Sequence, residues 1–180
     1  MSNLRLADAI EDVKRLASRG ARPKQIAALT GVGIEALYDR WASLSDRKAP
    51  RGPTRPGTIV LERDPLHAGV FLCLVDRILH HDPAVGPIDL AVLSFDIYDA
   101  VVPPKRRAEG RPSYTIVETI ELIRCYRAGA IFRQTCQCWQ LPIYLTKDMA
   151  AARRRCPFAR DLPPPCKSCS PPKAKPAPVP

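Results

Sequence analysis

Residues 22–43 read RPKQIAALTGVGIEALYDRWAS, and this stretch carries the clearest structural pattern in the chain. Pro23 suits the first turn of a helix that runs through Leu29, because the first N–H groups of a helix have no partner within it. Four turn residues follow, among which Gly31 can take the left-handed backbone conformation that a side chain resists. Residues 34–44 then place apolar side chains at helical spacing. The stretch predicts a helix-turn-helix-like unit.

A unit of this kind offers its last helix to the major groove of DNA. Tyr38 and Arg40 lie on that helix and carry hydrogen-bonding groups that can read base edges. Arg22 and Lys24, with Arg19 close by, lie around the start of the preceding helix, where positive charge can contact phosphates. These residues are candidate DNA contacts.

The same two helices have an alternative use, as a corner that docks a partner protein. Val32 and Leu37 are expected to fill the angle between the helices in either case. Glu35 and Asp39 would repel phosphates, which favours protein docking. The sequence leaves both uses open.

The segments on either side of this unit differ in character. Upstream, residues 3–19 carry apolar side chains at helical spacing and predict a first helix. Downstream, residues 45–58 combine basic side chains with proline and glycine and show no periodicity, which is typical of a linker or arm. Further candidate DNA contacts in this arm are Arg47, Lys48 and Arg51.

The middle of the chain is expected to be a helical core. Residues 66–80 are apolar on nearly every side, so we expect them deep in the core, after a helix start at Asp64-Pro65. Residues 89–101 and 113–127 predict two further helices. After Gly129, alternating and cysteine-bearing stretches predict short strands.

The predicted fold class is mainly α, with a small zinc-ribbon-like segment near the carboxyl end. Changes in composition predict a helix-turn-helix-like helical unit at residues 1–44, a basic proline-rich linker at 45–58, a helical core at 59–128, a cysteine-rich zinc-binding segment at 129–169 and a disordered Pro/Lys tail at 170–180.

Charge is unevenly distributed along the 180 residues, whose formal net charge is +10. Residues 1–56 contain 11 basic and 6 acidic side chains (+5), residues 57–100 contain 2 and 7 (−5), and residues 101–180 contain 15 and 5 (+10). The two basic regions suit a polyanion such as DNA, or are solvated faces without a ligand. The acidic middle should face protein or water.

Nothing in the sequence predicts a membrane protein. No stretch approaches the roughly 18 apolar residues that a membrane-spanning helix needs. Residues 1–20 include acidic side chains and lack the unbroken apolar stretch of a signal peptide. We therefore expect a cytoplasmic protein with no membrane partner.

Five of the seven cysteines lie between residues 136 and 169. Such clustering in a cytoplasmic protein favours a metal over disulfides, and Zn²⁺ takes four thiolates in a tetrahedral site. A short, proline-rich segment lacks the side chains for its own core, so a metal would hold it together. A redox dithiol and uncoordinated thiols are the alternatives. The candidate ligands are Cys136, Cys138, Cys156, Cys166 and Cys169.

An enzyme is not expected. Four sulfur ligands leave no open position for a catalytic water, so the zinc would be structural. No glycine-rich phosphate loop or nucleophile–base pair is present. Several residues that might suggest catalysis have simpler expected roles. Core packing is expected for Cys73 and Cys125, a surface or capping position for His67, His80 and His81, and a solvated position for Asp96 and Asp99.

Three stretches carry a resemblance to a known family. They are LASRGARPKQIAALTGVGIEALYDRWASLSDRKAPRGPTRPG at residues 16–57, YTIVETIELIRCYRAG at residues 114–129, and the cysteine-rich end with its Ser-Pro-Pro and basic residues. On these stretches the chain resembles the FlhC family, whose members join FlhD in a transcriptional regulator of proteobacterial flagella. Together the stretches span most of residues 10–175, although the middle matches only in apolar character.

The FlhC family holds one zinc with two C-x-x-C pairs, and this chain departs from that pattern. Cys136 falls on the first ligand position, but Trp139 occupies the second. A count without gaps places Cys156 on the third position and Ala159 on the fourth. Residues 166–169 read CKSC and resemble the second pair after an insertion. The implied ligands are Cys136, Cys138, Cys166 and Cys169, or a set in which Cys156 replaces one of them.

The resemblance implies a DNA-binding transcriptional activator subunit with one structural zinc per chain. The subunit would form a hetero-oligomer with FlhD, bind promoter DNA and recruit RNA polymerase to flagellar operons. Arg153, Arg154 and Arg155 are expected to hold the DNA backbone with little sequence selectivity. The alternative is a family member that has lost DNA binding and acts as a partner-docking modulator.

Overall fold

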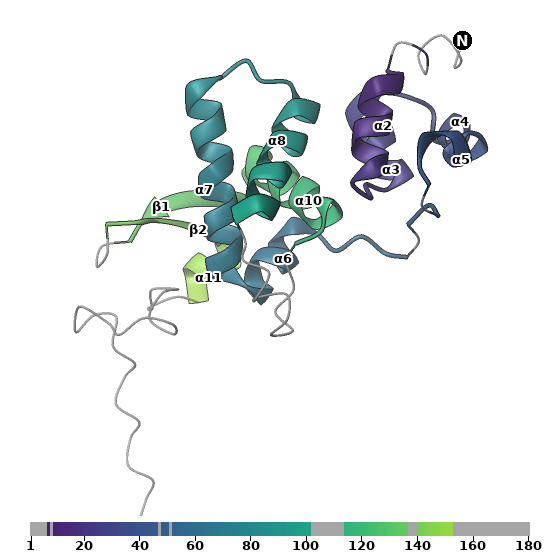
Figure 1. Cartoon of the computed structure of the whole chain (residues 1–180). Coiled ribbons are helices and arrows are strands. Elements are labelled where there is room, and N and C mark those ends of the chain that lie inside the picture. Colours follow the sequence, from purple (N-terminus) through teal and green to yellow (C-terminus); the bar gives the residue numbers. More distant parts are fainter. Residues whose placement is uncertain are drawn as a thin grey trace, which may run out of the picture.

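The computed structural model describes residues 7, 9–46, 48–50, 52–101, 114–136 and 140–152, and this part of the chain is mainly helical, as expected (Figure 1). Its elements are α2 (Ile10–Ser18), α3 (Pro23–Thr30), α4 (Ile34–Asp39), α5 (Trp41–Leu44), α6 (Gly57–Arg63), α7 (Pro65–His81), α8 (Pro87–Val101), α10 (Ile116–Arg127), β1 (Ile131–Thr135), β2 (Pro142–Thr146) and α11 (Lys147–Ala152). None of the described helices has the length and apolar character needed to span a bilayer. The tail at 170–180 lies outside the described residues.

The turn between α3 and α4 forms as its glycines predict. α3 ends at Gly31, whose φ of 72° is the left-handed conformation expected there. Gly33 is extended and immediately precedes α4. Val32 and Leu37 are both buried, which confirms their expected place in the core of this unit.

The helix expected over residues 34–44 is two helices in the structure. Arg40 leaves the helical conformation (φ −109°, ψ 10°), so α4 ends before it and α5 begins after it. Trp41 and Leu44 are buried beyond this break. Tertiary packing can outweigh helix propensity in so short a segment, because short helices have little stability of their own.

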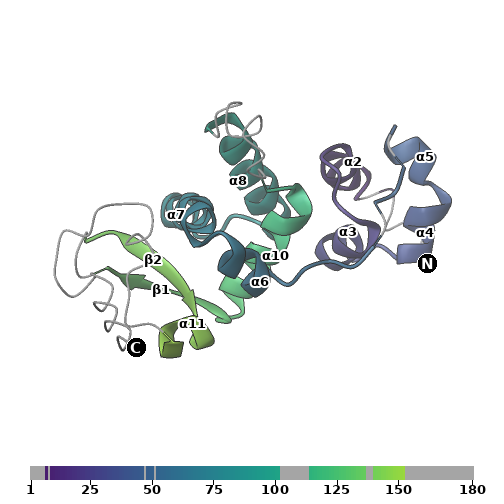
Figure 2. The ribbon, with the colours of Figure 1, turned by 90° about the horizontal axis from the view of Figure 1, so that it is seen from below.

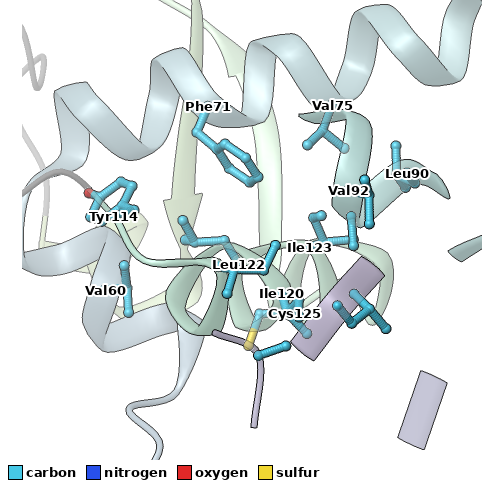
Figure 3. Packing of buried hydrophobic residues seen from close by; sticks show 14 of the residues in the cluster. Val60, Phe71, Val75, Leu90, Val92, Tyr114, Ile120, Leu122, Ile123 and Cys125 are labelled. Carbon is cyan, nitrogen blue, oxygen red and sulfur yellow. The ribbon is translucent and has the colours of Figure 1, made fainter. Parts of the chain in front are cut away.

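The helices α6, α7, α8 and α10 contribute to a continuous hydrophobic core (Figure 3). Phe71 and Val75 of α7 are fully buried, as is Leu122 of α10. The other side of α7 is less deeply buried than its apolar composition predicts, because Val70 is 47% exposed. The expected helical core is therefore present, but α7 lines one side of it.

Most helix boundaries lie within a few residues of those expected. α7 and α8 each extend slightly beyond the predicted ranges. α10 begins at Ile116 instead of residue 113, because Thr115 caps it: the Thr115 hydroxyl accepts from the Glu118 N–H, and the Glu118 carboxylate accepts from the Thr115 N–H at 3.0 Å. The helix α11 follows β2 and is not expected, because the sequence predicts only strands and metal ligands in this segment.

The helix α6 begins at Gly57, inside the stretch expected to be linker, so the linker ends at Pro56. α6 approaches α10 very closely at this point. A Cβ atom on Gly57 would lie 2.3 Å from the carbonyl oxygen of Glu121, a distance that real Cβ atoms essentially never show. Only glycine fits here, and its lack of a side chain lets the two backbones meet.

The strands β1 and β2 form an antiparallel pair in which Arg133 lies opposite Tyr144, which confirms the short strands expected after Gly129. The Asp76 carboxylate on α7 accepts hydrogen bonds from the hydroxyls of Tyr126 (2.5 Å) and Tyr144. The same carboxylate lies 3.6 Å from the Arg133 guanidinium. One side chain therefore joins α7, α10 and both strands.

The N-terminal helices are arranged so that α2 and α3 face α8 and α10 (Figure 2). α4 and α5 lie on the far side of α2 and α3, away from the rest of the molecule (Figures 1 and 2). The element expected to meet DNA is therefore at the outer end of the described structure.

Candidate nucleic-acid interface

The outer side of α4 and the break after it carry two of the residues expected to contact DNA, Tyr38 and Arg40. Leu37 points into the unit, whereas Glu35, Asp39 and Arg40 are exposed and Tyr38 is 53% exposed. A phenol and a guanidinium are thus accessible on this surface, together with two carboxylates that repel phosphates.

Both lysines proposed as DNA contacts are also on the surface. Lys24 at the start of α3 and Lys48 in the linker are exposed. Among the residues that the structure describes, no carboxylate forms an ion pair with Lys24, Lys48 or Arg40. Their charges are therefore not neutralised by a described neighbour and can attract an external anion.

Arg22 has an internal role that the sequence does not reveal. Its guanidinium donates hydrogen bonds to the carbonyl of Gly52 and, at 3.1 Å, to the hydroxyl of Thr54. Its Nε is buried and has no hydrogen-bond partner among the described residues. Arg22 thus attaches the linker to the start of α3, and this use competes with the phosphate contact expected of it.

Arg19 is likewise engaged within the protein. Its Nε and Nη2 donate to the two carboxylate oxygens of Asp96 on α8 at 2.7 and 2.6 Å. These hydrogen bonds hold the pKa of the Asp96 carboxyl below its usual value and raise the pKa of Arg19. The expectation that Asp96 is merely solvated is wrong, because its partner lies 77 residues away in the sequence and no local pattern indicates it.

A buried polar contact between α3 and α10 also escapes sequence analysis. The Gln25 amide donates to the Val117 carbonyl (3.0 Å) and to the Glu121 carboxylate (3.2 Å). The other Glu121 oxygen accepts from the guanidinium of Arg124 at 2.7 and 2.9 Å. Gln25 and Glu121 are both buried. The N-terminal helices therefore dock through polar groups as well as apolar ones.

Cys136, the first candidate metal ligand, follows directly after β1 and is 4% exposed. Its N–H donates to the Leu141 carbonyl, and its carbonyl accepts from the Gln140 N–H, both at 2.8 Å. Gln140 has a φ of 53°, which is rare for a residue with a side chain. These bonds hold the backbone of Cys136 against Gln140 and Leu141.

The other cysteines fall into two groups. Cys125 is buried and Cys73 is partly buried, so both lie in or against the core as expected. Cys138, Cys156, Cys166 and Cys169 lie outside the described residues. Within the described part of the chain, no group of three or more candidate ligands could hold a metal ion.

Five of the candidate DNA contacts lie outside the described part of the chain. They are Arg47, Arg51, Arg153, Arg154 and Arg155.

Of the histidines, His80 and His81 are exposed, but His67 is buried, so its expected surface position is wrong. Its Nδ1 lies 2.9 Å from the Tyr98 hydroxyl, and its ring packs edge-on against Tyr98 and Tyr114. Aromatic packing between α7, α8 and the start of α10 holds the histidine in the core. Its position on the buried face of α7 is the signal that could have indicated this.

No known family model matches this sequence, and no curated protein matches it.

Proposed function

We propose that the chain is a DNA-binding subunit of a transcriptional activator of the FlhC kind. The observation that supports this most is an exposed set of groups, Lys24, Tyr38, Arg40 and Lys48, on a helix–turn–helix-like unit at the outer end of the molecule. Tyr38 on α4 and Arg40 directly after it contact base edges, and Lys24 and Lys48 contact backbone phosphates. In such a role the protein acts in the cytoplasm.

The activator is a hetero-oligomer with an FlhD-type partner and recruits RNA polymerase. Partner docking is supported by apolar side chains that α8 leaves on the surface. Leu93 is 45% exposed and Val101 is 58% exposed, and Ile97 lies between them at the same helical spacing. Such a stripe is more often covered in an assembly than left in water.

One structural zinc per chain stabilises the cysteine-rich segment at 129–169. The support is the chemistry of the donor set and the position of Cys136, a buried thiol directly after β1. Thiolates are preferred zinc ligands, and four of them complete a tetrahedral structural site. The remaining ligands are drawn from Cys138, Cys156, Cys166 and Cys169.

The test is DNA binding by the purified chain, with and without FlhD, on a flagellar promoter fragment and an unrelated duplex. A Lys24→Gln/Arg40→Gln/Lys48→Gln variant should weaken binding to both duplexes, and its slope of log K against log salt should be shallower by about 0.9 for each phosphate that is no longer neutralised. The control, Arg77→Gln/Arg127→Gln/Lys147→Gln, removes the same charge from exposed positions elsewhere. Equal weakening by the two variants would refute this DNA surface.

The second candidate function is a partner-docking modulator without DNA binding. It is favoured by the internal engagement of Arg19 and Arg22 and by the carboxylates of Glu35 and Asp39 on α4. If the chain binds FlhD and neither the chain nor the complex shifts either duplex, this second function replaces the first.

A further inference from the structure

The contact between α2 and α8 pairs two arginines with two aspartates. Arg15 Nη1 lies 2.9 Å from an oxygen of Asp89 and 3.1 Å from an oxygen of Asp12 on its own helix, and Arg19 binds both oxygens of Asp96 through two parallel hydrogen bonds. This two-pronged geometry is also the way in which arginine binds a phosphate group. The α8 carboxylates therefore occupy guanidinium groups that could otherwise bind a polyanion.

We infer that α8 is an autoinhibitory element, whose Asp89 and Asp96 compete with DNA phosphates for Arg15 and Arg19. In the closed arrangement described here the carboxylates hold both arginines. In the open arrangement the N-terminal helices rotate away from α8, and backbone phosphates take the place of the carboxylates. The inference rests on the DNA-binding function proposed above.

The two ion pairs are weak enough to be displaced. The side chains of Arg15 and Asp89 are 42% and 58% exposed, and those of Arg19 and Asp96 are 27% and 45% exposed. Pairs at this exposure contribute little to stability and are screened by salt. A duplex presents many phosphates at once, so it can compete with two single carboxylates.

The linker provides a pivot for this rotation. Arg22 attaches Gly52 and Thr54 to the N-terminal helices, while Gly57 is fixed against the backbone of α10. Only Arg55 and Pro56 remain between these two anchors. The three residue steps from Thr54 to Gly57 span at most about 10 Å, so the N-terminal helices can rotate about this point but cannot separate far from the core.

Opening would leave no buried carboxylate without a cation. Gln25 would lose its hydrogen bonds to Val117 and Glu121, but one Glu121 oxygen would keep both of its contacts with the Arg124 guanidinium on the same helix. An unpaired buried charge is the costly outcome of breaking a polar interface, and this arrangement avoids it.

The test uses the full chain and a duplex of random sequence. The Asp89→Asn/Asp96→Asn variant should bind it about three- to tenfold more tightly than wild type, with a salt slope steeper by about 0.9 for each additional phosphate that is neutralised. A control, Asp82→Asn/Asp148→Asn, removes two exposed carboxylates that pair with no described arginine or lysine. It should bind more tightly only by the general effect of added positive charge.

The arginines provide the second half of a double-mutant cycle. Arg15→Gln/Arg19→Gln should hardly change duplex binding in the wild-type background, because the carboxylates already occupy both side chains. In the Asp89→Asn/Asp96→Asn background the same change should remove the gain in affinity. Amide hydrogen exchange of residues 10–18 without DNA should be faster in Asp89→Asn/Asp96→Asn than in the control variant.

Three results would contradict the inference. Equal gains by the two carboxylate variants would show that only net charge matters. Weakening of wild-type binding by Arg15→Gln/Arg19→Gln would show that the arginines contact DNA in the closed arrangement. Unchanged hydrogen exchange in α2 would show that the carboxylates do not hold the contact closed. If no form binds the duplex, the proposed DNA-binding function fails, and competition with DNA fails with it.

Discussion

Tyr126 shows how one partly buried contact sets the pKa of a single residue. Burial raises the pKa of Tyr126 to about 12, and its hydrogen bond to the Asp76 carboxylate contributes to that rise. A tyrosine in the unfolded chain titrates near 10. The folded state therefore holds this proton more tightly, and its contribution to stability is complete below about pH 10 and is lost as the pH rises to about 12.

We predict that Asp76→Asn lowers the pKa of Tyr126 toward its ordinary value without restoring it fully, because burial remains. The measurement is tyrosinate absorbance during alkaline titration of the folded protein. Tyr126→Phe assigns the signal, since that variant should lack this titration. An unchanged titration in Asp76→Asn would mean that the carboxylate does not influence the phenol.

Gly57 provides a prediction on packing. Gly57→Ala places a methyl group against the Glu121 carbonyl, so α6 and α10 must move apart. Overpacking of this kind costs about 1–3 kcal/mol of the free energy of unfolding, which urea unfolding would measure. The matched control is Gly69→Ala in the middle of α7, where the nearest atom to a new Cβ is 3.9 Å away on Tyr144. That variant should gain up to about 1 kcal/mol, because alanine is the better helix former.

Gly31 and Gly57 show what a sequence can and cannot predict at the residue scale. Gly31 is predictable because its neighbours form a local helix–turn–helix pattern and the backbone needs a positive φ. Gly57 is not, because the chain that crowds it is more than sixty residues away, at Glu121. The sequence misplaces Asp96 for the same reason, because its partner Arg19 is distant along the chain.

At the scale of elements, local patterns predict helices well where periodicity is long. The observed ends of α7 and α8 lie close to the expected ones, because each helix spans several turns of apolar spacing. The sequence does not predict the short elements α5 and α11 separately, since a single turn carries no periodic signal. Their existence depends on packing, which the sequence does not display.

Docking of α2 on α8 leads to a prediction on pH and salt. Asp96→Asn should lower the free energy of unfolding at pH 7 by less than about 1 kcal/mol, because the pair is partly exposed. The hydrogen bonds from Arg19 lower the pKa of Asp96, so the stabilisation is full above about pH 5 and is lost as the pH falls through that lowered pKa. The difference between variant and wild type should therefore vanish in strong acid and shrink in high salt.

Urea unfolding at several pH values and salt concentrations measures this difference. Asp82→Asn serves as the control, because Asp82 pairs with no described arginine or lysine, and its hydrogen bond from the Ala84 N–H survives as an amide contact. A deficit in Asp96→Asn that persists unchanged in high salt would indicate impaired packing instead of a broken ion pair.

For the whole molecule, composition and charge predict a mainly helical protein with a basic outer unit, but not how its charges are used. The acidic middle is partly neutralised by the N-terminal helices, through Asp89 and Asp96, instead of facing only a partner or water. Net charge per segment is a property of composition, whereas neutralisation depends on which segments meet in space.

The zinc proposal makes a prediction about the whole chain. Purified protein examined by mass spectrometry under non-denaturing conditions should carry about one zinc per chain. Cys136→Ser should lose it, and Cys73→Ala should keep it, because Cys73 packs against the core, far along the sequence from the other cysteines. Chelator should lower the melting temperature of wild type but not of Cys136→Ser, since only wild type has metal to lose.

Serine variants of the other four cysteines then identify the ligand set. A tetrahedral site takes four ligands, so one of the five serine variants should retain zinc. Retention by Cys156→Ser selects the pairs Cys136/Cys138 and Cys166/Cys169, whereas retention by Cys138→Ser, Cys166→Ser or Cys169→Ser shows that Cys156 replaces that residue. Wild-type protein that contains no zinc and melts identically with chelator would contradict the proposal. Zinc would then not be what stabilises a segment with so little apolar surface.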